Sequence, residues 1–268
     1  MTVLAPSITS LTNPRVKAAV RLRDRHERDE TGLTIVDGDR EILRALDHNV
    51  RVAEAFVCRE LIRSDDAETA VRRLEIAGAT IRDVSETVLA KIAFGDRSEG
   101  VVAVVQSPST ALEMLTPAAD PLIVVVEGVE KPGNLGAMLR TADGAGADAL
   151  LAADARTDLF NPNAIRASVG TIFSVPLAAG TSADVLGWLV ARAITPIAAR
   201  VDAQTLYSDV DLRGPVAIVL GSEADGLTEA WDDPRVTPVR IPMRGTVDSL
   251  NVSVAAAVLL YEAVRQRA

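Results

Sequence analysis

The stretch that most constrains the fold lies near the C-terminus, at residues 239–261, where a strand pattern changes to a helix pattern. Val239 to Ile241 is typical of a strand end, and Pro242 ends the strand because proline has no N–H to donate to a ladder. Four residues favoured in turns follow: Gly245, Asp248, Ser249 and Asn251. A helix then begins near Val252, with one of the last two as its N-cap. The loop is either an ordinary connection or a site where N–H groups at the helix start meet a polar ligand.

Two earlier stretches have the same order of apolar strand, glycine-bearing loop and helix. The first runs from Leu122 to Ala142, and the second runs from Val216 to Leu227. The β-branched run from Ile123 to Val126 favours a parallel strand covered on both faces. Further strands are expected at Ala149–Ala152, Pro196–Arg200 and Thr237–Ile241. The second half of the chain is therefore expected to form a doubly wound α/β domain.

Together the three stretches resemble motifs 1, 2 and 3 of the SpoU family, also called TrmH, within the SPOUT class of RNA methyltransferases. Motif 1 matches as Asn-x-Gly-x-x-x-Arg-Thr-Ala at residues 134–142, and motif 2 as Gly-Ser-Glu-x-x-Gly-Leu at residues 221–227. Motif 3 matches as Ile-Pro-Met at residues 241–243 with Ser-Leu-Asn-Val-Ser-Val-Ala at residues 249–255. The resemblance implies a C-terminal SPOUT domain with a trefoil knot, although topology rules alone would argue against a knot.

The resemblance also implies an activity, the transfer of a methyl group from S-adenosylmethionine to a ribose 2′-hydroxyl of RNA. By the same resemblance the main chain and apolar side chains of five residues bind the cofactor: Leu220, Gly221, Ile241, Met243 and Leu250. Glycine at 221 would let the main chain approach the ligand closely. The alternative for each apolar residue is ordinary core packing.

Arg140 matches the catalytic arginine of the family. The usual proposal makes this arginine a general base, but free arginine has a pKa above about 12, so stabilising the oxyanion and holding the phosphate is the easier role. Asn134, Ser249 and Asn251 would orient the ribose, the phosphate or the methionine moiety. Glu223 would hold the motif 2 loop or the nucleotide. The alternative for Arg140 is a solvated helix face.

Residues 33–106 alternate short strands and helices, which predicts a small α/β domain. Phe94–Ala103 resembles the end of the substrate-binding domain of many SpoU proteins, a fold like that of ribosomal protein L30e. The polar stretch Gln106–Thr110 is the expected boundary. We therefore expect an N-terminal RNA substrate-binding domain at residues 1–107 and the catalytic domain at residues 108–268.

The charge of the chain argues against RNA binding, because its net charge is −9 and its pI about 4.9. Residues 13–28 differ, since six basic and two acidic residues give this segment a local charge of +4. One helix beginning at Asn13-Pro14 would place four cations on one face: Lys17, Arg21, Arg25 and Arg28. That face could bind a phosphate backbone or could simply be solvated. Arg97 and Arg166 are further candidates for RNA contact. The alternative for Arg97 is that it only closes a turn, and the alternative for Asn161, shortly before Arg166, is helix capping.

The sequence lacks the residue patterns that a dinucleotide site, a serine hydrolase or a metal site would need. The first strand of the second half is not followed by Gly-x-Gly-x-x-Gly, so a dinucleotide site is disfavoured. Both histidines lie within the first 48 residues, away from every candidate serine, which disfavours a serine hydrolase. A single cysteine, Cys58, with two histidines offers no metal-ligand cluster. No run reaches about 18 apolar residues and no secretion signal is recognised, so a cytoplasmic protein is expected.

Three hypotheses remain. The favoured one is a ribosomal RNA 2′-O-methyltransferase, preferred over a transfer RNA enzyme because of the separate N-terminal domain. The others are a non-catalytic RNA-binding relative and an unrelated α/β nucleotide-binding enzyme. The resemblance also implies a homodimer formed by the catalytic domain, and the apolar surface of the final helix, Val252 to Arg265, is broad enough to need a partner. The alternative is a helix central to a monomer.

Overall fold

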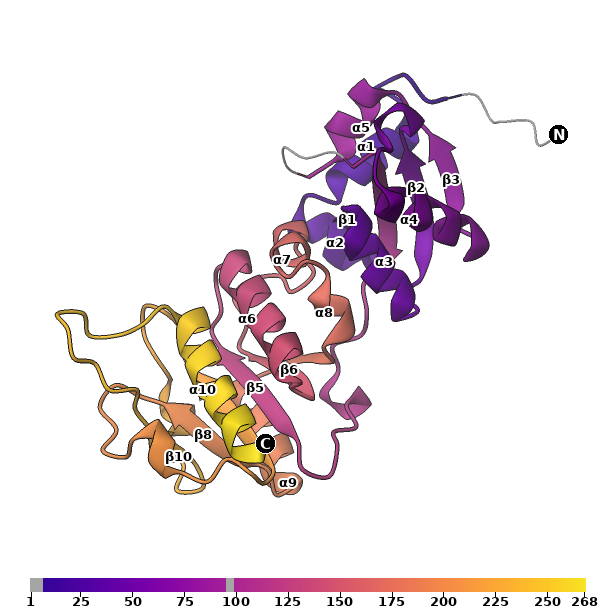
Figure 1. Cartoon of the computed structure of the whole chain (residues 1–268). Helices are drawn as coiled ribbons and strands as arrows, with labels where there is room; N and C mark the ends of the chain where they lie inside the picture. The colour runs from indigo at the N-terminus through magenta and orange to yellow at the C-terminus, as the bar shows by residue number, and fades with distance from the viewer. Residues whose placement is uncertain (1–6, 95–98) are drawn as a thin grey trace. The chain divides into compact units, whose positions relative to one another are not determined.

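The structure is a computed structural model that describes residues 7–94 and 99–268 (Figure 1). Its contacts divide the chain into two compact units. The first unit contains Met1–Pro108 and Phe160–Ser174, and the second contains Ser109–Leu159 and Val175–Ala268. The segment 160–174 therefore groups with the first unit although it lies in the second half of the sequence. The two-domain division at residue 107 remains a prediction.

The first unit has the predicted alternation of strands and helices. Its elements are α1 (Pro14–Arg21), α2 (Arg25–Thr31), β1 (Leu33–Asp37), α3 (Asp39–Asp47), β2 (Val52–Val57), η1 (Arg59–Leu61), α4 (Asp65–Ile76), β3 (Thr80–Asp83), α5 (Glu86–Ile92), β4 (Val101–Gln106), α7 (Pro162–Ala167) and α8 (Thr171–Ser174). The strands form one sheet in the order β1-β4-β2-β3, in which β4 is antiparallel to both of its neighbours. Helices α1 and α5 bury Val16, Ala19, Val88 and Leu89 on this sheet.

The prediction of one basic helix beginning at residue 13 is wrong, because the helix is interrupted by a turn between α1 and α2. Asn13 caps α1 as expected, accepting a hydrogen bond from the Arg15 N–H at 2.9 Å. The helix ends where Leu22 turns into the core, and Asp24 begins the next helix by accepting from the His26 N–H. Arg28 does not share a face with Lys17 and Arg21; it is buried and donates to the Leu22 carbonyl at 2.7 Å.

The segment 160–174 is fastened to β1 and α3 within the first unit. The Thr34 hydroxyl donates to the Phe160 carbonyl at 2.8 Å, and Arg44 donates to the Val169 carbonyl. Arg166 pairs with the buried carboxylate of Asp37 at 3.1 Å. Each of these contacts gives a polar group of the segment or of its neighbours a hydrogen-bond or ion-pair partner, as buried polar groups require.

The second unit has the expected parallel sheet. Its elements are η2 (Leu112–Met114), β5 (Leu122–Glu127), α6 (Pro132–Ala145), β6 (Ala149–Ala153), β7 (Leu177–Gly180), α9 (Ser182–Ala191), β8 (Thr195–Ala199), η3 (Tyr207–Asp209), β9 (Val216–Leu220), η4 (Glu229–Trp231), β10 (Thr237–Val239) and α10 (Val252–Arg267). The strands run in the order β10-β8-β9-β5-β6-β7, and every pair is parallel. Strand β7 was not predicted. The trefoil knot remains a prediction.

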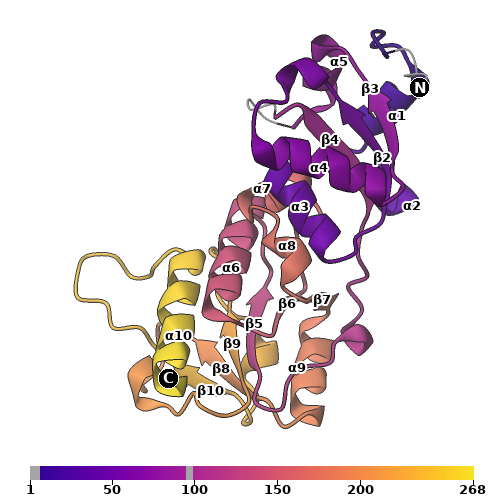
Figure 2. The same cartoon turned by 45° about the vertical axis from the view of Figure 1, so that its right-hand side comes forward.

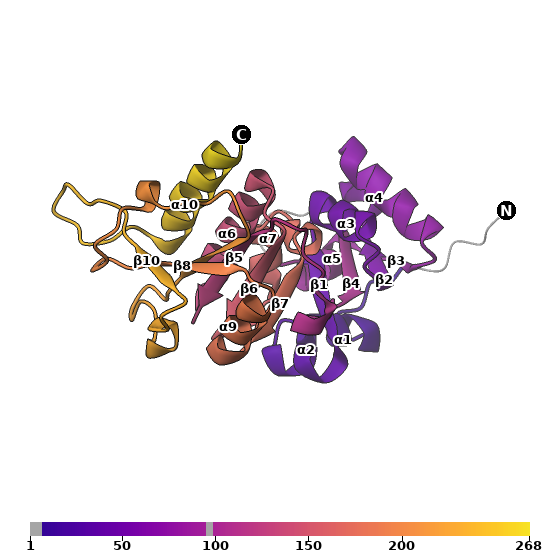
Figure 3. The same cartoon turned by 90° about the horizontal axis from the view of Figure 1, so that it is seen from below.

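Helices cover both faces of this sheet. Helices α6 and α10 pack side by side on one face, and α9 lies on the opposite face (Figure 3). Ile123, Val125 and Leu151 pack with Val185 and Leu189 of α9 in one core. Because successive strand side chains point to opposite faces, residues 124, 126 and 150 point toward the α6 and α10 layer. Burial on both faces explains why β5 and β9 are apolar at nearly every position.

The loops that carry the three motifs leave the same edge of the sheet. Strands β5, β9 and β10 are mutually aligned in one parallel sheet, so residues after Glu127, Leu220 and Val239 all begin at its carboxyl edge (Figure 2). Ligands of open α/β sheets bind at this edge. Among the described residues, no helix combines the length and apolar character needed to cross a lipid bilayer.

Candidate active site

The motif 3 loop, residues 240–251, ends at a capped helix. The Asn251 side chain accepts hydrogen bonds from the Ser253 N–H at 2.9 Å and the Ser253 hydroxyl at 2.6 Å. Asn251 is therefore the N-cap of α10, and Ser249 stays in the loop. The other end of this loop is held by hydrogen bonds between Arg240 and residues 205 and 207.

The motif 2 loop, residues 221–227, is a tight turn closed on itself. The N–H of Ser222 donates to the Gly226 carbonyl at 3.0 Å, and the N–H of Gly226 donates back at 3.1 Å. A Cβ atom at Gly221 would lie 2.2 Å from the Gly226 carbonyl carbon. The close approach that requires glycine at 221 is therefore made by the loop's own main chain.

The base of the motif 2 loop is fixed by a buried carboxylate. Glu127, at the end of β5, accepts from the Thr228 N–H at 2.8 Å and from the Thr228 hydroxyl at 2.7 Å. It also accepts from the Ser182 hydroxyl, which in turn contacts Asp154 at 2.7 Å. One side chain thus connects the end of the motif 2 loop to β5 and to the start of α9.

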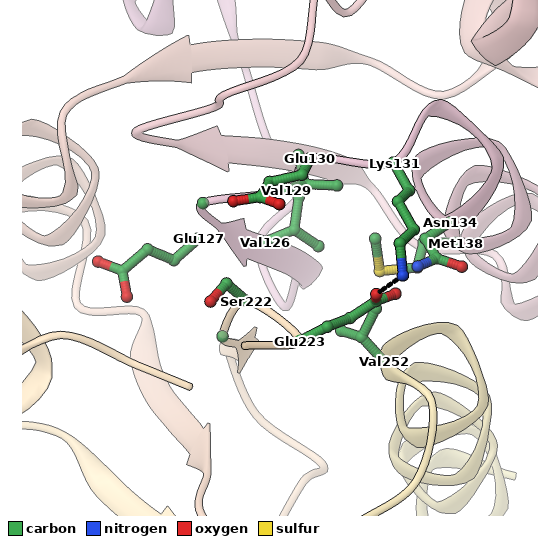
Figure 4. A pocket seen from close by; sticks show the side chains of 12 residues that line it. Val126, Glu127, Val129, Glu130, Lys131, Asn134, Met138, Ser222, Glu223 and Val252 are labelled. Atoms are coloured by element: carbon green, nitrogen blue, oxygen red, sulfur yellow. Dashed lines mark hydrogen bonds and ion pairs between the residues drawn. The ribbon is translucent and has the colours of Figure 1, made fainter. Parts of the chain in front are cut away.

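The motif 1 loop, residues 128–131, meets the other two motifs. Lys131 forms an ion pair with Glu223 of motif 2, and the side chains face each other directly (Figure 4). Asn134, on the first turn of α6, accepts from the Asn251 amide at 3.4 Å. The structure therefore brings four of the five predicted catalytic residues together at one edge: Asn134, Glu223, Ser249 and Asn251.

A pocket of about 630 Å³ opens between the motif 2 and motif 3 loops. All five predicted cofactor-binding residues line it: Leu220, Gly221, Ile241, Met243 and Leu250. Its wall also includes residues for which the sequence predicted no role in cofactor binding: Ala199, Arg200, Val201, Val239, Asp248, Val252 and Ala255. Ala199 ends β8 and residues 200–201 follow it, and the only available signal was that an apolar strand ends there. The pocket has the size and mixed lining of a small-molecule site.

A second, much smaller cavity of about 20 Å³ lies between the motif 1 and motif 2 loops. It shares Gly221, Ser222, Glu223 and Val252 with the larger pocket, so the two are neighbours. Figure 4 shows Lys131, Asn134 and Glu223 on one side of it, whereas the Glu127 side chain points away from them. The three motifs therefore border two neighbouring cavities.

Arg140 is exposed on α6 and is not part of the lining of either pocket. The predicted RNA-binding residues belong to the first unit, where Lys17, Arg21 and Arg25 are exposed. Arg21 pairs with Glu27 at 3.2 Å and Arg25 pairs with Asp29 at 3.5 Å. Arg97 lies outside the described residues.

Arg166 is engaged rather than solvated, since it also donates to the Phe94 carbonyl at 2.8 Å. Burial raises the pKa of its partner Asp37 to about 6, against the opposing effects of the Phe94 N–H and of Arg166 itself. Asn161 caps α7 by accepting from the Asn163 N–H, as the capping alternative predicted.

Residues 121–261 of the chain match the SpoU rRNA methylase family, and residues 13–103 match the MRM3-like substrate-binding domain. The 23S rRNA (guanosine-2′-O-)-methyltransferase RlmB of Ralstonia nicotianae is 35% identical over 86% of this chain and 94% of its own. A solved RNA 2′-O ribose methyltransferase is 42% identical with a TM-score of 0.85, covering 98% of this chain and 99% of its own. An AdoMet-bound rRNA methyltransferase from Sinorhizobium meliloti is 29% identical with a TM-score of 0.88, covering 97% of each chain. The chain belongs to the SpoU rRNA methylase family.

Proposed function

We propose that the protein transfers a methyl group from S-adenosylmethionine to a ribose 2′-hydroxyl of ribosomal RNA. The observation that supports this most directly is the meeting of motifs 2 and 3 around the pocket of about 630 Å³, beside the side chains of Asn134 and Glu223. Relatives that match most of this chain and most of their own length are named 23S rRNA 2′-O-methyltransferases, which favours ribosomal RNA over transfer RNA.

The residues of the larger pocket fit the cofactor. Ile241 and Leu250 offer apolar surface for a flat ring, and the main chain of Leu220 and Gly221 borders the same pocket. Ser249 and Asn251, on either side of Leu250 in the chain, add polar residues to the lining of this pocket. When bound, the cofactor would supply a methyl group on a sulfonium centre. The ribose 2′-oxygen would gain this methyl and release its proton to solvent, and the sulfonium would leave as a neutral thioether.

The protein's own residues position the ribose and stabilise charge. The hydrogen-bonded pair Asn134 and Asn251 joins motifs 1 and 3, so each fixes the other beside the pocket. Glu223 keeps the motif 2 loop near Lys131. Arg140 stabilises the developing alkoxide, because a guanidinium stays charged and acts as an electrostatic donor.

A homodimer would explain why Arg140 lies outside the pockets of its own chain. Helices α6 and α10 pack together, and α10 leaves Val254 and Tyr261 about half exposed, at 48% and 53%. A symmetric pair would cover these side chains in one isologous interface and direct Arg140 of one chain toward the pocket of the other. Lys17, Arg21 and Arg25 of the first unit are proposed to contact the RNA, and a ribosomal substrate implies work in the cytoplasm.

Calorimetry with S-adenosylmethionine and with NAD tests the cofactor, and mapping of 2′-O-methyl sites in 23S rRNA tests the reaction. We expect binding of S-adenosylmethionine alone and one new methylated ribose. Arg140→Ala should lower methylation by at least about 100-fold with unchanged cofactor affinity. Binding of NAD instead, or an RNA without new methylation, would refute the proposed function.

Mixed chains test whether the site is shared. Arg140→Ala chains lack the cation, whereas Leu250→Glu chains lack the apolar wall of the pocket. A heterodimer of the two should regain about a quarter to a half of wild-type activity if each site uses both chains. Sedimentation as a monomer at micromolar concentration would refute the dimer, and a dimer without rescue would refute the shared site.

A further inference from the structure

Two exposed cations join the motif 1 side of the site to the motif 2 loop. Lys131 pairs with Glu223, and Arg156, in the loop after β6, pairs with Glu130 at 2.5 Å and with Asp225 at 3.4 Å. Lys131 and Arg156 both follow strands at the carboxyl edge of the sheet, where the candidate site lies. The two cations thus meet three carboxylates around the mouth of the site.

These ion pairs do little for stability. The side chains of Lys131 and Arg156 are 70% and 53% exposed. Exposed pairs are screened by solvent and salt, and holding two long side chains costs conformational entropy. Their hydrogen bonds to carboxylates raise the pKa of both cations, so both stay charged at neutral pH. The pairs hold two positive charges in place, and a more strongly binding anion can replace the carboxylates as their partner.

The chemistry of both cations matches phosphate. The guanidinium of Arg156 already holds carboxylate oxygens from two loops, and a phosphate presents oxygens to the same fork. Lys131 acts as a compact point charge beside the small cavity that contains Asn134 and Glu223. The three carboxylates and two cations together carry a net negative charge, which disfavours the binding of a single anion. An RNA strand presents several phosphates together and can compete for both cations.

We infer that Lys131 and Arg156 bind phosphates of the RNA strand beside the target nucleotide, and that Glu130, Glu223 and Asp225 occupy these cations until the RNA displaces them. This inference rests on the proposed function. Glu223 and Asp225 also line the larger pocket, so displacement frees carboxylates of the loop that borders the cofactor. RNA binding and the motif 2 loop are thereby coupled through exchange of ion-pair partners.

Opposite substitutions in one ion pair separate this role from a structural one. Arg156→Gln removes the cation, and Glu130→Gln removes its competing carboxylate. If the pair only orders the loops, both substitutions should affect RNA binding in the same direction. If RNA competes with Glu130, Arg156→Gln should weaken binding about 3- to 10-fold and Glu130→Gln should tighten it about 2- to 5-fold. Lys131→Gln should behave like Arg156→Gln.

A second exposed pair in the same unit gives the matched control. Arg213 and Asp211 pair at 2.9 Å with similar exposure, and they precede β9 at the opposite, amino edge of the sheet. Arg213→Gln and Asp211→Asn change the net charge in the same way as the test variants. We expect both to leave RNA affinity within about 2-fold of wild type, since long-range charge effects are screened beyond about 10 Å.

The measurement is filter binding of the full-length protein to a 23S rRNA transcript, from about 50 to about 200 mM salt. Loss of Lys131 or Arg156 should reduce the salt slope by about one unit each. If the wild-type protein binds the transcript, two results would overturn this inference and leave the proposed function standing. One is that Arg156→Gln and Glu130→Gln change RNA affinity in the same direction, and the other is that their effects equal those of the control pair. A wild-type protein that does not bind the transcript would overturn the proposed function and this inference with it.

Discussion

The motif 2 loop is held by carboxylates at both its base and its tip, and the two environments differ. At the base Glu127 is 3% exposed and accepts three hydrogen bonds. At the tip Glu223 and Asp225 meet their cations in solvent. A buried acceptor that loses its donors leaves them unsatisfied, whereas exposed groups exchange one partner for another or for water. The base is therefore suited to fixing the loop, and the tip is suited to responding to a ligand.

The largest effect is expected between base and tip, at Gly221. Gly221→Val would place a side chain against the main chain of Gly226, so the turn must open. We expect S-adenosylmethionine affinity to fall by at least about 100-fold and the protein to lose about 2–4 kcal/mol of stability. Gly214→Val is the control, because its Cβ would meet no atom within 4 Å. Normal cofactor binding by both variants would show that the turn is not rigid.

Removal of the base carboxylate should have the next largest effect. Glu127→Ala leaves the N–H and hydroxyl of Thr228 and the hydroxyl of Ser182 without their acceptor, at a cost of about 2–4 kcal/mol. Urea denaturation measures this loss. Glu130→Ala is the control, because it removes an exposed carboxylate three residues further along the chain, and it should leave the urea midpoint almost unchanged. Equal midpoints for both variants would remove the distinction between base and tip.

Sequence patterns predicted most strands because apolar, β-branched runs such as Ile123–Val126 are unambiguous when a sheet is buried on both faces. Strand β7 was missed because Leu177–Gly180 consists mainly of small residues that favour no structure strongly. The break between α1 and α2 was missed because helical spacing continued through it. The turn follows from burial of Leu22 and Arg28, which is a tertiary effect.

Three local patterns identified the motif loops, and the pocket between the motif 2 and motif 3 loops is lined by all five residues predicted to bind the cofactor. Their roles remain predictions. Glu127 and Arg156 were not identified. Both act between segments distant in sequence: Glu127 reaches Thr228, and Arg156 reaches Asp225. Local spacing cannot report such pairs. The reason for glycine at 221 was likewise attributed to the ligand, whereas the loop's own main chain requires it.

A buried carboxylate of the first unit should make the stability of the protein depend on pH. Burial raises the pKa of Asp37 from 3.8 to about 6. Between these values the folded protein keeps a proton that the unfolded chain has lost, so stability falls as pH rises through the window. The shift corresponds to about 3 kcal/mol, fully lost above about pH 6. Asp37→Asn should therefore show a flatter decrease from pH 4 to 6 in urea denaturation.

The control for this titration is an exposed carboxylate. Hydrogen bonds from Arg213 lower the pKa of Asp211 to about 2, so its contribution is present above the unfolded pKa and is lost only as pH falls below about 4. Asp211→Asn should not change the slope between pH 4 and 6. Glu41, whose pKa is also raised by burial, titrates in the same direction and keeps a residual slope in Asp37→Asn. Identical slopes in wild type and Asp37→Asn would contradict the assignment.

The smallest effect on stability is expected at the tip. Lys131→Gln and Arg156→Gln remove cations whose partners are exposed carboxylates, and those carboxylates regain water. Neither variant should move the melting temperature by more than about 2 °C, even at low salt. Differential scanning calorimetry at low and high salt measures this directly, with Arg213→Gln as the control. A fall of more than about 5 °C in either variant would mean that the tip, like the base, holds the loop in place. The loss of RNA affinity expected of these variants would then follow from a disordered loop, and only the opposite effect of Glu130→Gln would still distinguish phosphate binding.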